Sequence, residues 1–120
     1  MNIETIYDDD ELYRRINEQW IKENGDISSA AFQNTSNTDE MSVDLARLTN
    51  IKKTTLNNLI YGIASLITID VRKLDQEVFH SPEQDNDAHS TVKGNKNKRI
   101  KKALAKLATP IHYPESFVYQ

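Results

Sequence analysis

Hydrophobic residues recur at helical spacing near the start of the chain. Leu12, Ile16 and Trp20 lie four residues apart, which places them along one side of a helix. The acidic residues 8–11 precede this stripe, and carboxylates favour the free amides and positive dipole end of a helix start. Gly25 follows as a natural stop. The pattern predicts a helix over about residues 9–23.

A second clear helical pattern lies near the other end of the chain. Ile100, Leu104 and Leu107 share one side of a helix predicted over about residues 97–108, and lysine and arginine fill the rest. Pro110 disfavours helical geometry in the residue before it, so the helix should stop there. Residues 109–120 are expected to pack back as an extended tail.

The middle of the chain reads as short strands joined by turns. The β-branched run 63–69 predicts a buried strand. Further strands are expected at 77–80 and, by alternation, at 88–92. Residues 41–45 alternate as a half-buried strand would, but Asp44 could equally cap a short helix that runs to Arg47 or Leu48. Residues 27–34 are expected to form a strand or an irregular segment anchored by Phe32, and residues 34–40 a polar loop. A helix should start at Thr54 or Thr55 and end at Gly62. A helical turn is expected from Asp70 to Leu74, and a turn at 81–87.

These elements predict an α+β fold, in which a small mixed or antiparallel sheet packs with an N-terminal and a C-terminal helix. A chain of 120 residues matches the usual size of one domain. We therefore expect a single domain over 1–120, with a core from about residue 8 to 108.

Composition narrows the chemistry that the chain offers. The sequence has no cysteine, so disulfides, thiolate metal sites and thiol nucleophiles are excluded. The sequence indicates neither a metal site nor a cofactor. No apolar run approaches the roughly 20 residues of a membrane helix, and no secretory signal is visible. We expect a cytoplasmic protein that does not enter membranes.

The net charge of −3 hides an asymmetry along the chain. Residues 1–60 carry 11 acids and 6 bases, whereas residues 61–120 carry 7 acids and 9 bases. Residues 93–106 contain no acid, and Lys98, Arg99 and Lys102 are candidates for contacts with the phosphates of nucleic acid. The same pattern is typical of a solvated amphipathic helix or of a surface that docks an acidic partner. Residues 93–106 contain no aromatic residue that could stack on bases, which weakens the interpretation as a nucleic-acid site.

Histidine and arginine supply the remaining candidate chemistry. His80 and His89 flank the acidic turn 81–87, so either could serve as a base oriented by a carboxylate. Both could equally be structural, and the two rings could project from opposite faces of a sheet. Arg14 and Arg15 are adjacent, and an arginine at the edge of an apolar face can bind a carboxylate or phosphate through two hydrogen bonds.

Four segments together resemble a family of short bacterial proteins of unknown function. They read DELYRRI at 10–16, ISSAAF at 27–32, MSVD at 41–44 and DNDAH at 85–89. Where this chain has Asp87, that pattern tends to have proline. The resemblance implies no activity, but it selects polar positions for a shared site: Arg14 or Arg15, Ser28, Ser42, Asn86 and His89.

Three functions follow as hypotheses. The first is an accessory protein of the bacterial cytoplasm that binds a protein partner, and a role in conflict between phage and host stays open. The second is an enzyme or ligand-binding protein for an anionic nucleotide or phosphoester, with catalytic candidates His89, Asn86 and Ser28 and binding candidates Arg14, Arg15, Ser42 and His80. The third is nonspecific nucleic-acid binding through Lys98, Arg99 and Lys102. If the second is right, His89, Asn86, Ser28 and an arginine should line one pocket.

Overall fold

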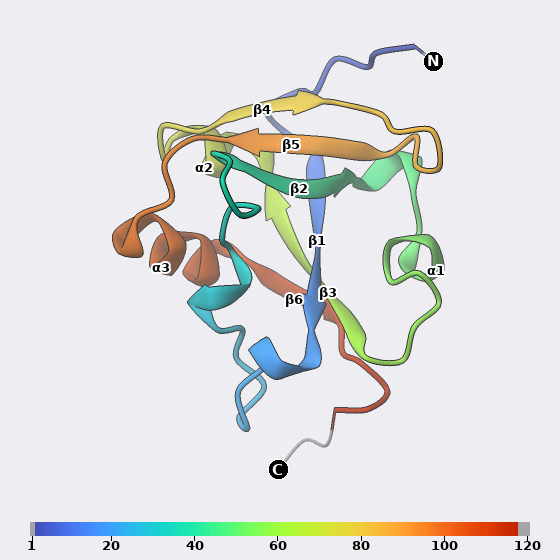
Figure 1. Cartoon of the computed structure of the whole chain (residues 1–120), viewed down its shortest axis with the longest axis vertical. Coiled ribbons are helices and arrows are strands. Elements are labelled where there is room, and N and C mark those ends of the chain that lie inside the picture. Colours follow the sequence, from blue (N-terminus) through green and yellow to red (C-terminus); the bar gives the residue numbers. More distant parts are fainter. Residues whose placement is uncertain (1, 118–120) are drawn as a thin grey trace.

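A six-stranded antiparallel sheet forms the centre of the computed structural model, which describes residues 2–117 (Figure 1). The strands lie in the order β4-β5-β2-β1-β3-β6. Their bounds are β1 Glu11–Asn17, β2 Glu40–Leu45, β3 Tyr61–Ile67, β4 Glu77–His80, β5 His89–Lys93 and β6 Thr109–His112. The helices are α1 Ile51–Thr54, α2 Thr68–Arg72 and α3 Lys98–Leu107, and single 3-10 turns lie at Glu18–Trp20, Ser29–Ala31 and Ala46–Leu48. The α+β class is therefore confirmed.

The sheet divides into two halves where β1 meets β2. β1 pairs with β3 along all of its residues, from Glu11 to Asn17. It pairs with β2 only through Leu12 and Tyr13, which oppose Leu45 and Asp44. In Figure 1, β1 and β3 run down the molecule while β2, β5 and β4 run across its upper part. The two strands therefore separate after Tyr13, and this separation forms the candidate site.

The core lies on the side of the sheet that α3 helps to cover. Phe32 is fully buried, as expected from the sequence. Asn97 caps the start of helix α3: its side-chain oxygen accepts a hydrogen bond from the Ile100 amide at 2.9 Å, and the helix buries Ile100 and Leu104. The same core buries Leu12, Ile16, Met41, Leu45, Leu66, Val71 and Val92.

The helix expected over residues 9–23 is wrong, because this segment contains strand β1 and a 3-10 turn at Glu18–Trp20. Leu12 and Ile16 are both fully buried. A spacing of four residues satisfies both the helical period and the two-residue period of a strand. Arg14, which lies between them on the same side of the strand, hides the alternation that would have indicated a strand.

The acidic residues 8–11 do not cap a helix, and two of them, Asp8 and Asp10, pair with arginines of later segments. Arg47 donates to Asp10 at 3.0 Å and to Glu4 at 2.6 Å. Arg72 donates to Asp8 at 2.7 Å and to the carbonyl oxygen of Ile6 at 2.9 Å. The chain before β1 is therefore held against the rest of the molecule.

The helix expected after Thr54 or Thr55 is also wrong. Helix α1 ends at Thr54 and is capped by Asn50, whose side chain accepts from the Lys53 amide at 2.9 Å. Leu56 and Asn57 follow with φ angles of 57° and 52°, in the left-handed region, so the helix cannot continue. Gly62, expected to end that helix, lies inside β3.

Most strands expected in the middle of the chain are confirmed. β3, β4 and β5 form where alternation or a β-branched run predicts them, and residues 41–45 adopt the strand alternative within β2. Residues 27–34 are largely irregular around the 3-10 turn Ser29–Ala31, and α2 begins two residues before Asp70. α3 agrees with the expected C-terminal helix, and β6 extends the sheet beside β3. The last residues of the expected tail, 118–120, lie outside the described residues.

Candidate functional site

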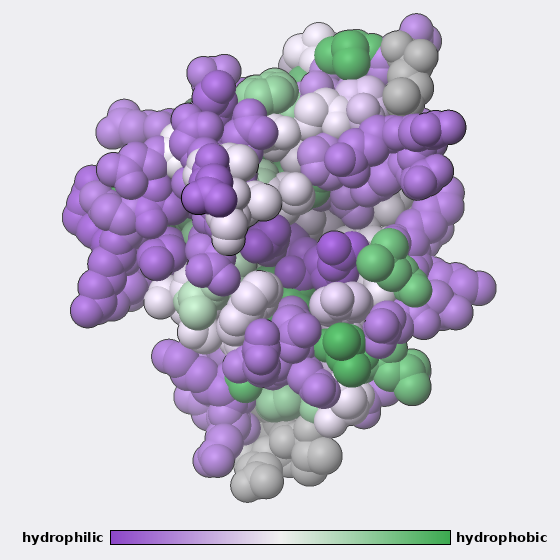
Figure 2. Space-filling model, in the orientation of Figure 1, coloured by the Kyte–Doolittle hydropathy of each residue, from purple (hydrophilic) through white to green (hydrophobic). Residues whose placement is uncertain are grey.

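An open cavity of about 520 Å³ lies where β1 and β2 separate; we call it the cleft. Five side chains singled out from the sequence line it together: Arg14, Arg15, Ser42, Asn86 and His89. They come from β1, from β2, from the turn after β4 and from β5. Figure 2 shows that the middle of this face is hydrophilic. Residues far apart in the sequence therefore meet at one place.

Arg14 occupies the gap that opens between β1 and β2. Its Nη1 donates to the Ser42 carbonyl oxygen at 2.8 Å and its Nε donates to the Ala31 carbonyl oxygen at 2.9 Å. Because β1 has separated from β2 at this point, the Ser42 carbonyl oxygen has no ladder partner on β1, and the Arg14 guanidinium group supplies the missing donor. Burial, and secondarily repulsion from Arg15, lowers the pKa of Arg14 to about 10. Among residues 2–117, no carboxylate forms an ion pair with Arg14.

Arg15 is the second guanidinium of the cleft. It lies over the ring of Tyr61 at 5.0 Å from the ring centre, and its Nη1 donates a long hydrogen bond of 3.4 Å to the Thr54 carbonyl oxygen. The side chain is exposed, and within the described part of the chain it too has no carboxylate partner. The cleft therefore holds two adjacent guanidinium groups, neither of which forms an ion pair within residues 2–117, although the acids Asp44, Glu83 and Asp85 also line it.

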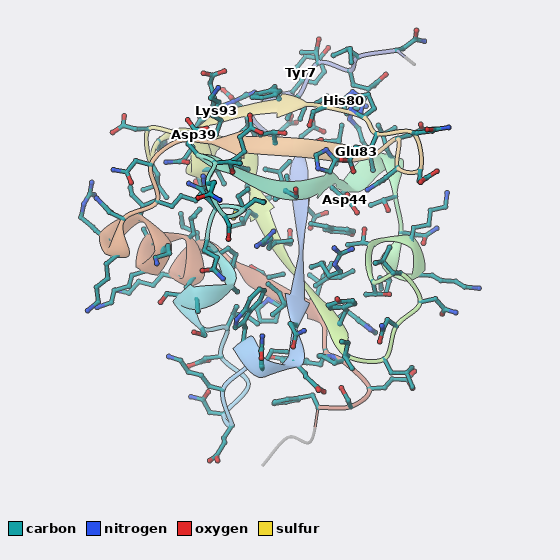
Figure 3. All side chains as sticks on the ribbon, in the orientation of Figure 1. Tyr7, Asp39, Asp44, His80, Glu83 and Lys93 are labelled. Atoms are coloured by element: carbon teal, nitrogen blue, oxygen red, sulfur yellow. The ribbon has the colours of Figure 1, made fainter. Side chains whose placement is uncertain are left out.

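Asp44, on β2, also lines the cleft, and both of its carboxylate oxygens accept hydrogen bonds from neutral side chains. Its Oδ2 accepts from the Thr54 hydroxyl at 2.8 Å, and its Oδ1 accepts from the Asn86 amide at 2.8 Å. The Asn86 side-chain oxygen accepts from the Ala88 amide at 3.1 Å. Asn86 therefore fixes the turn before β5 against β2. Figure 3 labels Asp44 together with Glu83, a second acid that lines the cleft.

His89 has a defined tautomer because one of its ring nitrogens faces a main-chain carbonyl. Its Nδ1 lies 2.8 Å from the Ser81 carbonyl oxygen, which can only accept, so Nδ1 donates. In the neutral ring Nε2 then carries the lone pair, and the Ser42 hydroxyl lies 3.1 Å from it. A carboxylate oxygen of Glu83 is 3.9 Å from the same nitrogen. His89 is thus an oriented base that faces the cleft.

Two of the expected site residues have other roles. Ser28 does not line the cleft, because its hydroxyl oxygen accepts from the Ala30 amide at 3.2 Å and caps the turn Ser29–Ala31. His80 is buried: its Nδ1 accepts from the Glu4 amide at 2.7 Å, and its Nε2 donates to the Asp87 carbonyl oxygen at 2.6 Å. Because His80 opposes Ser90 in the ladder, it and His89 occupy alternate positions and project from opposite faces.

The basic candidates Lys98, Arg99 and Lys102 lie on α3, away from the cleft, and all three are exposed. Sequence reasoning missed several residues that shape the cleft, among them Thr54, Trp20 and Tyr61. The alternation of β2 was a signal for Asp44, since it shares a strand face with Ser42. Thr54 and Tyr61 gave no such signal, because the turn between them depends on left-handed residues.

Residues 2–117 contain no group of three or more histidine, aspartate or glutamate side chains placed to hold a metal ion. In the same residues, no helix has the length and apolar character needed to cross a bilayer. The cytoplasmic location and the family resemblance stay predictions. Comparison of the chain with protein-family models, curated proteins and solved structures finds no match.

Proposed function

We propose that the cleft binds a small anionic ligand that carries a phosphate group, such as a nucleotide or another phosphoester. The observation that supports this most directly is the pair of guanidinium groups, Arg14 and Arg15, which share the cleft without a carboxylate partner among the described residues. Bringing two such cations together raises the electrostatic energy of the free protein. Arg14 and Arg15 leave opposite faces of β1 and so reach the cleft from different directions. An anion bound in the cleft would relieve this repulsion and accept charge-assisted hydrogen bonds.

The rest of the cleft suits the body of such a ligand. Its volume of about 520 Å³ lies within the usual range for small-molecule sites. Three aromatic residues, Tyr13, Trp20 and Tyr61, line it and offer surfaces for a flat ring. Glu83 and Asp85 also line it, but the Glu83 side chain is 63% exposed, so water screens its charge.

The binding test compares two identical substitutions at different places. Arg15→Gln removes one cation of the cleft, and Arg99→Gln removes one cation of α3, which lies outside it. Titration calorimetry with inorganic phosphate and with adenosine monophosphate should show affinity at least about tenfold weaker for Arg15→Gln, which is about 1.4 kcal/mol of binding free energy. Arg99→Gln should bind as the unchanged protein does. Equal affinities for the two variants, or no binding by the unchanged protein, would contradict the proposal.

The other two hypotheses from the sequence stay predictions. Binding of a protein partner rests on the asymmetry of charge along the chain. Nucleic-acid binding is favoured by the exposure of Lys98, Arg99 and Lys102, whose helix turns Ile100 and Leu104 toward the core. Neither has a defined arrangement of hydrogen-bonding groups comparable to that of the cleft.

A further inference from the structure

Ser42 and His89 lie on neighbouring strands and face the same side of the sheet. In the β2–β5 ladder Ser42 opposes Thr91 and Asp44 opposes His89, so Ser42 and His89 are diagonal neighbours. Diagonal neighbours on one face are close enough for side chains to touch. The Ser42 hydroxyl oxygen and the His89 Nε2 are 3.1 Å apart, and both residues line the cleft.

Three features make this pair more than a chance surface contact. The Ser81 carbonyl oxygen holds Nδ1–H of His89, so the Nε2 lone pair is directed at the Ser42 hydroxyl. Ser42 is exposed to the cleft rather than covered. The main chain of Ser42 is also fixed, because Arg14 donates to its carbonyl oxygen at 2.8 Å. A hydroxyl, a base and a group that orients the base are the three parts of an activated nucleophile.

The same surroundings fit the charges that a displacement at phosphorus creates. Nη1 and Nε of Arg14 are engaged with carbonyl oxygens, while its Nη2 makes no hydrogen bond within residues 2–117 and can donate to a phosphoryl oxygen. Arg15 lines the same cavity. When His89 takes a proton it becomes a cation, and a carboxylate oxygen of the exposed Glu83 lies 3.9 Å from Nε2.

We propose that Ser42 is a nucleophile and His89 its general base, and that the pair hydrolyses phosphate monoesters in the cleft. This rests on the proposed binding of a phosphate group there. The Ser42 oxygen attacks phosphorus, and the bond from phosphorus to the ester oxygen breaks. The hydroxyl proton passes to His89 Nε2 and then to the departing ester oxygen, which leaves as an alcohol. Water next attacks the phosphoserine and gives its proton to His89, and the bond from phosphorus to the Ser42 oxygen breaks. His89 returns the proton to that oxygen, so inorganic phosphate and the free Ser42 hydroxyl are released.

The experiment uses the full chain and 4-nitrophenyl phosphate, whose aromatic ring suits the Tyr13, Trp20 and Tyr61 side of the cleft. Release of 4-nitrophenol is followed by absorbance, and quenched samples are digested and mapped by mass spectrometry. We expect phosphate on Ser42 in the unchanged protein. Ser42→Ala should abolish turnover, and His89→Gln should slow it by about 10² or more, as loss of a general base does. Ser36→Ala, an exposed serine outside the cleft, is the control and should leave turnover unchanged.

Inorganic phosphate binding is measured on the same variants, so that the two proposals can be told apart. Ser42→Ala should keep the affinity for phosphate within about twofold, because the guanidinium groups remain. Phosphate binding without any turnover by the unchanged protein would overturn the nucleophile assignment and leave the binding proposal standing. Turnover that survives in Ser42→Ala, or phosphate found on His89 instead, would overturn it as well.

Discussion

Lys96 is a charged residue in an almost closed environment, with 8% of its surface exposed. Its ammonium group donates to the carbonyl oxygens of Val92 at 3.0 Å and Gly94 at 3.1 Å, where β5 ends. Burial lowers the pKa of Lys96 from 10.5 to about 8; nearby Asp39 opposes the change and Arg14 adds to it. The folded protein therefore holds this proton less tightly than the unfolded chain does.

The free energy of unfolding should consequently rise with pH above about 8. Below that pH Lys96 carries the proton in both the folded and the unfolded state, so the free energy of unfolding is reduced by the full cost of burying the charge. Between pH 8 and 9.5 the folded state loses the proton while the unfolded state keeps it, which favours folding by about 2 kcal/mol. Urea unfolding at several pH values measures this. Lys96→Met should lack the rise, and an identical pH profile in both proteins would exclude Lys96 as its source.

The arginines of β1 show what sequence reasoning gained and missed at single positions. Arg14 and Arg15 were selected as binding candidates, and both line the cleft together with Ser42, Asn86 and His89. The polar character of these positions and the resemblance were sufficient to select them. Neither could reveal that Arg14 reaches the Ser42 carbonyl, since that contact depends on two strands separating.

Gly62 has an unexpected role at the scale of elements. It lies in β3, where the chain of β6 approaches closely: an added Cβ would lie 2.5 Å from the His112 carbonyl oxygen and 2.9 Å from Cδ of Pro114. The β3–β6 ladder also shifts register next to it, between Ile63 and Ala64. A glycine inside a strand often marks such a close approach.

Gly62→Ala should therefore weaken the β3–β6 pairing. The added methyl group meets main-chain atoms that cannot move aside without breaking the ladder, so we expect a loss of at least about 2 kcal/mol in the free energy of unfolding. Urea unfolding monitored by circular dichroism provides the measurement. An unchanged midpoint and slope would show that β6 can shift without cost.

Elements were predictable where one periodicity alone fitted the residues. The β-branched run in β3 and the one-sided apolar pattern of α3 each agree with the structure. β1 was misread because Leu12 and Ile16 fit two periods. α1 was misplaced because Leu56 adopts a left-handed conformation that propensity does not favour for leucine. Local pattern therefore gave the class of the fold but not its order of strands.

At the scale of the whole molecule, Arg72 links the segment before β1 to helix α2 and to the edge strand β4. Arg72 of α2 donates to Asp8, to the Ile6 carbonyl oxygen and to the Val78 carbonyl oxygen on β4. Ile6 is itself buried in the core. One side chain thus connects the N-terminal segment, a helix and an edge strand.

Arg72→Met should lower the free energy of unfolding by about 2 kcal/mol, because two carbonyl oxygens and a carboxylate lose a charged donor. Lys73→Met is a matched control, since the neighbouring side chain is exposed and makes no ion pair within residues 2–117. Thermal unfolding of both variants under one set of conditions provides the comparison. Equal losses would mean that the arginine contacts add nothing beyond a general effect of charge.

The separation of β1 from β2 has a mechanical consequence. The arginines stand on one half of the sheet and the Ser42–His89 pair on the other, and only two ladder positions join β1 to β2. A phosphate bound as we propose would contact both halves of the sheet and hold β1 and β2 together where the ladder between them ends. Ligand affinity and the resistance of β1 and β2 to further separation would then be coupled, because any change that spreads the two strands also moves the binding groups apart.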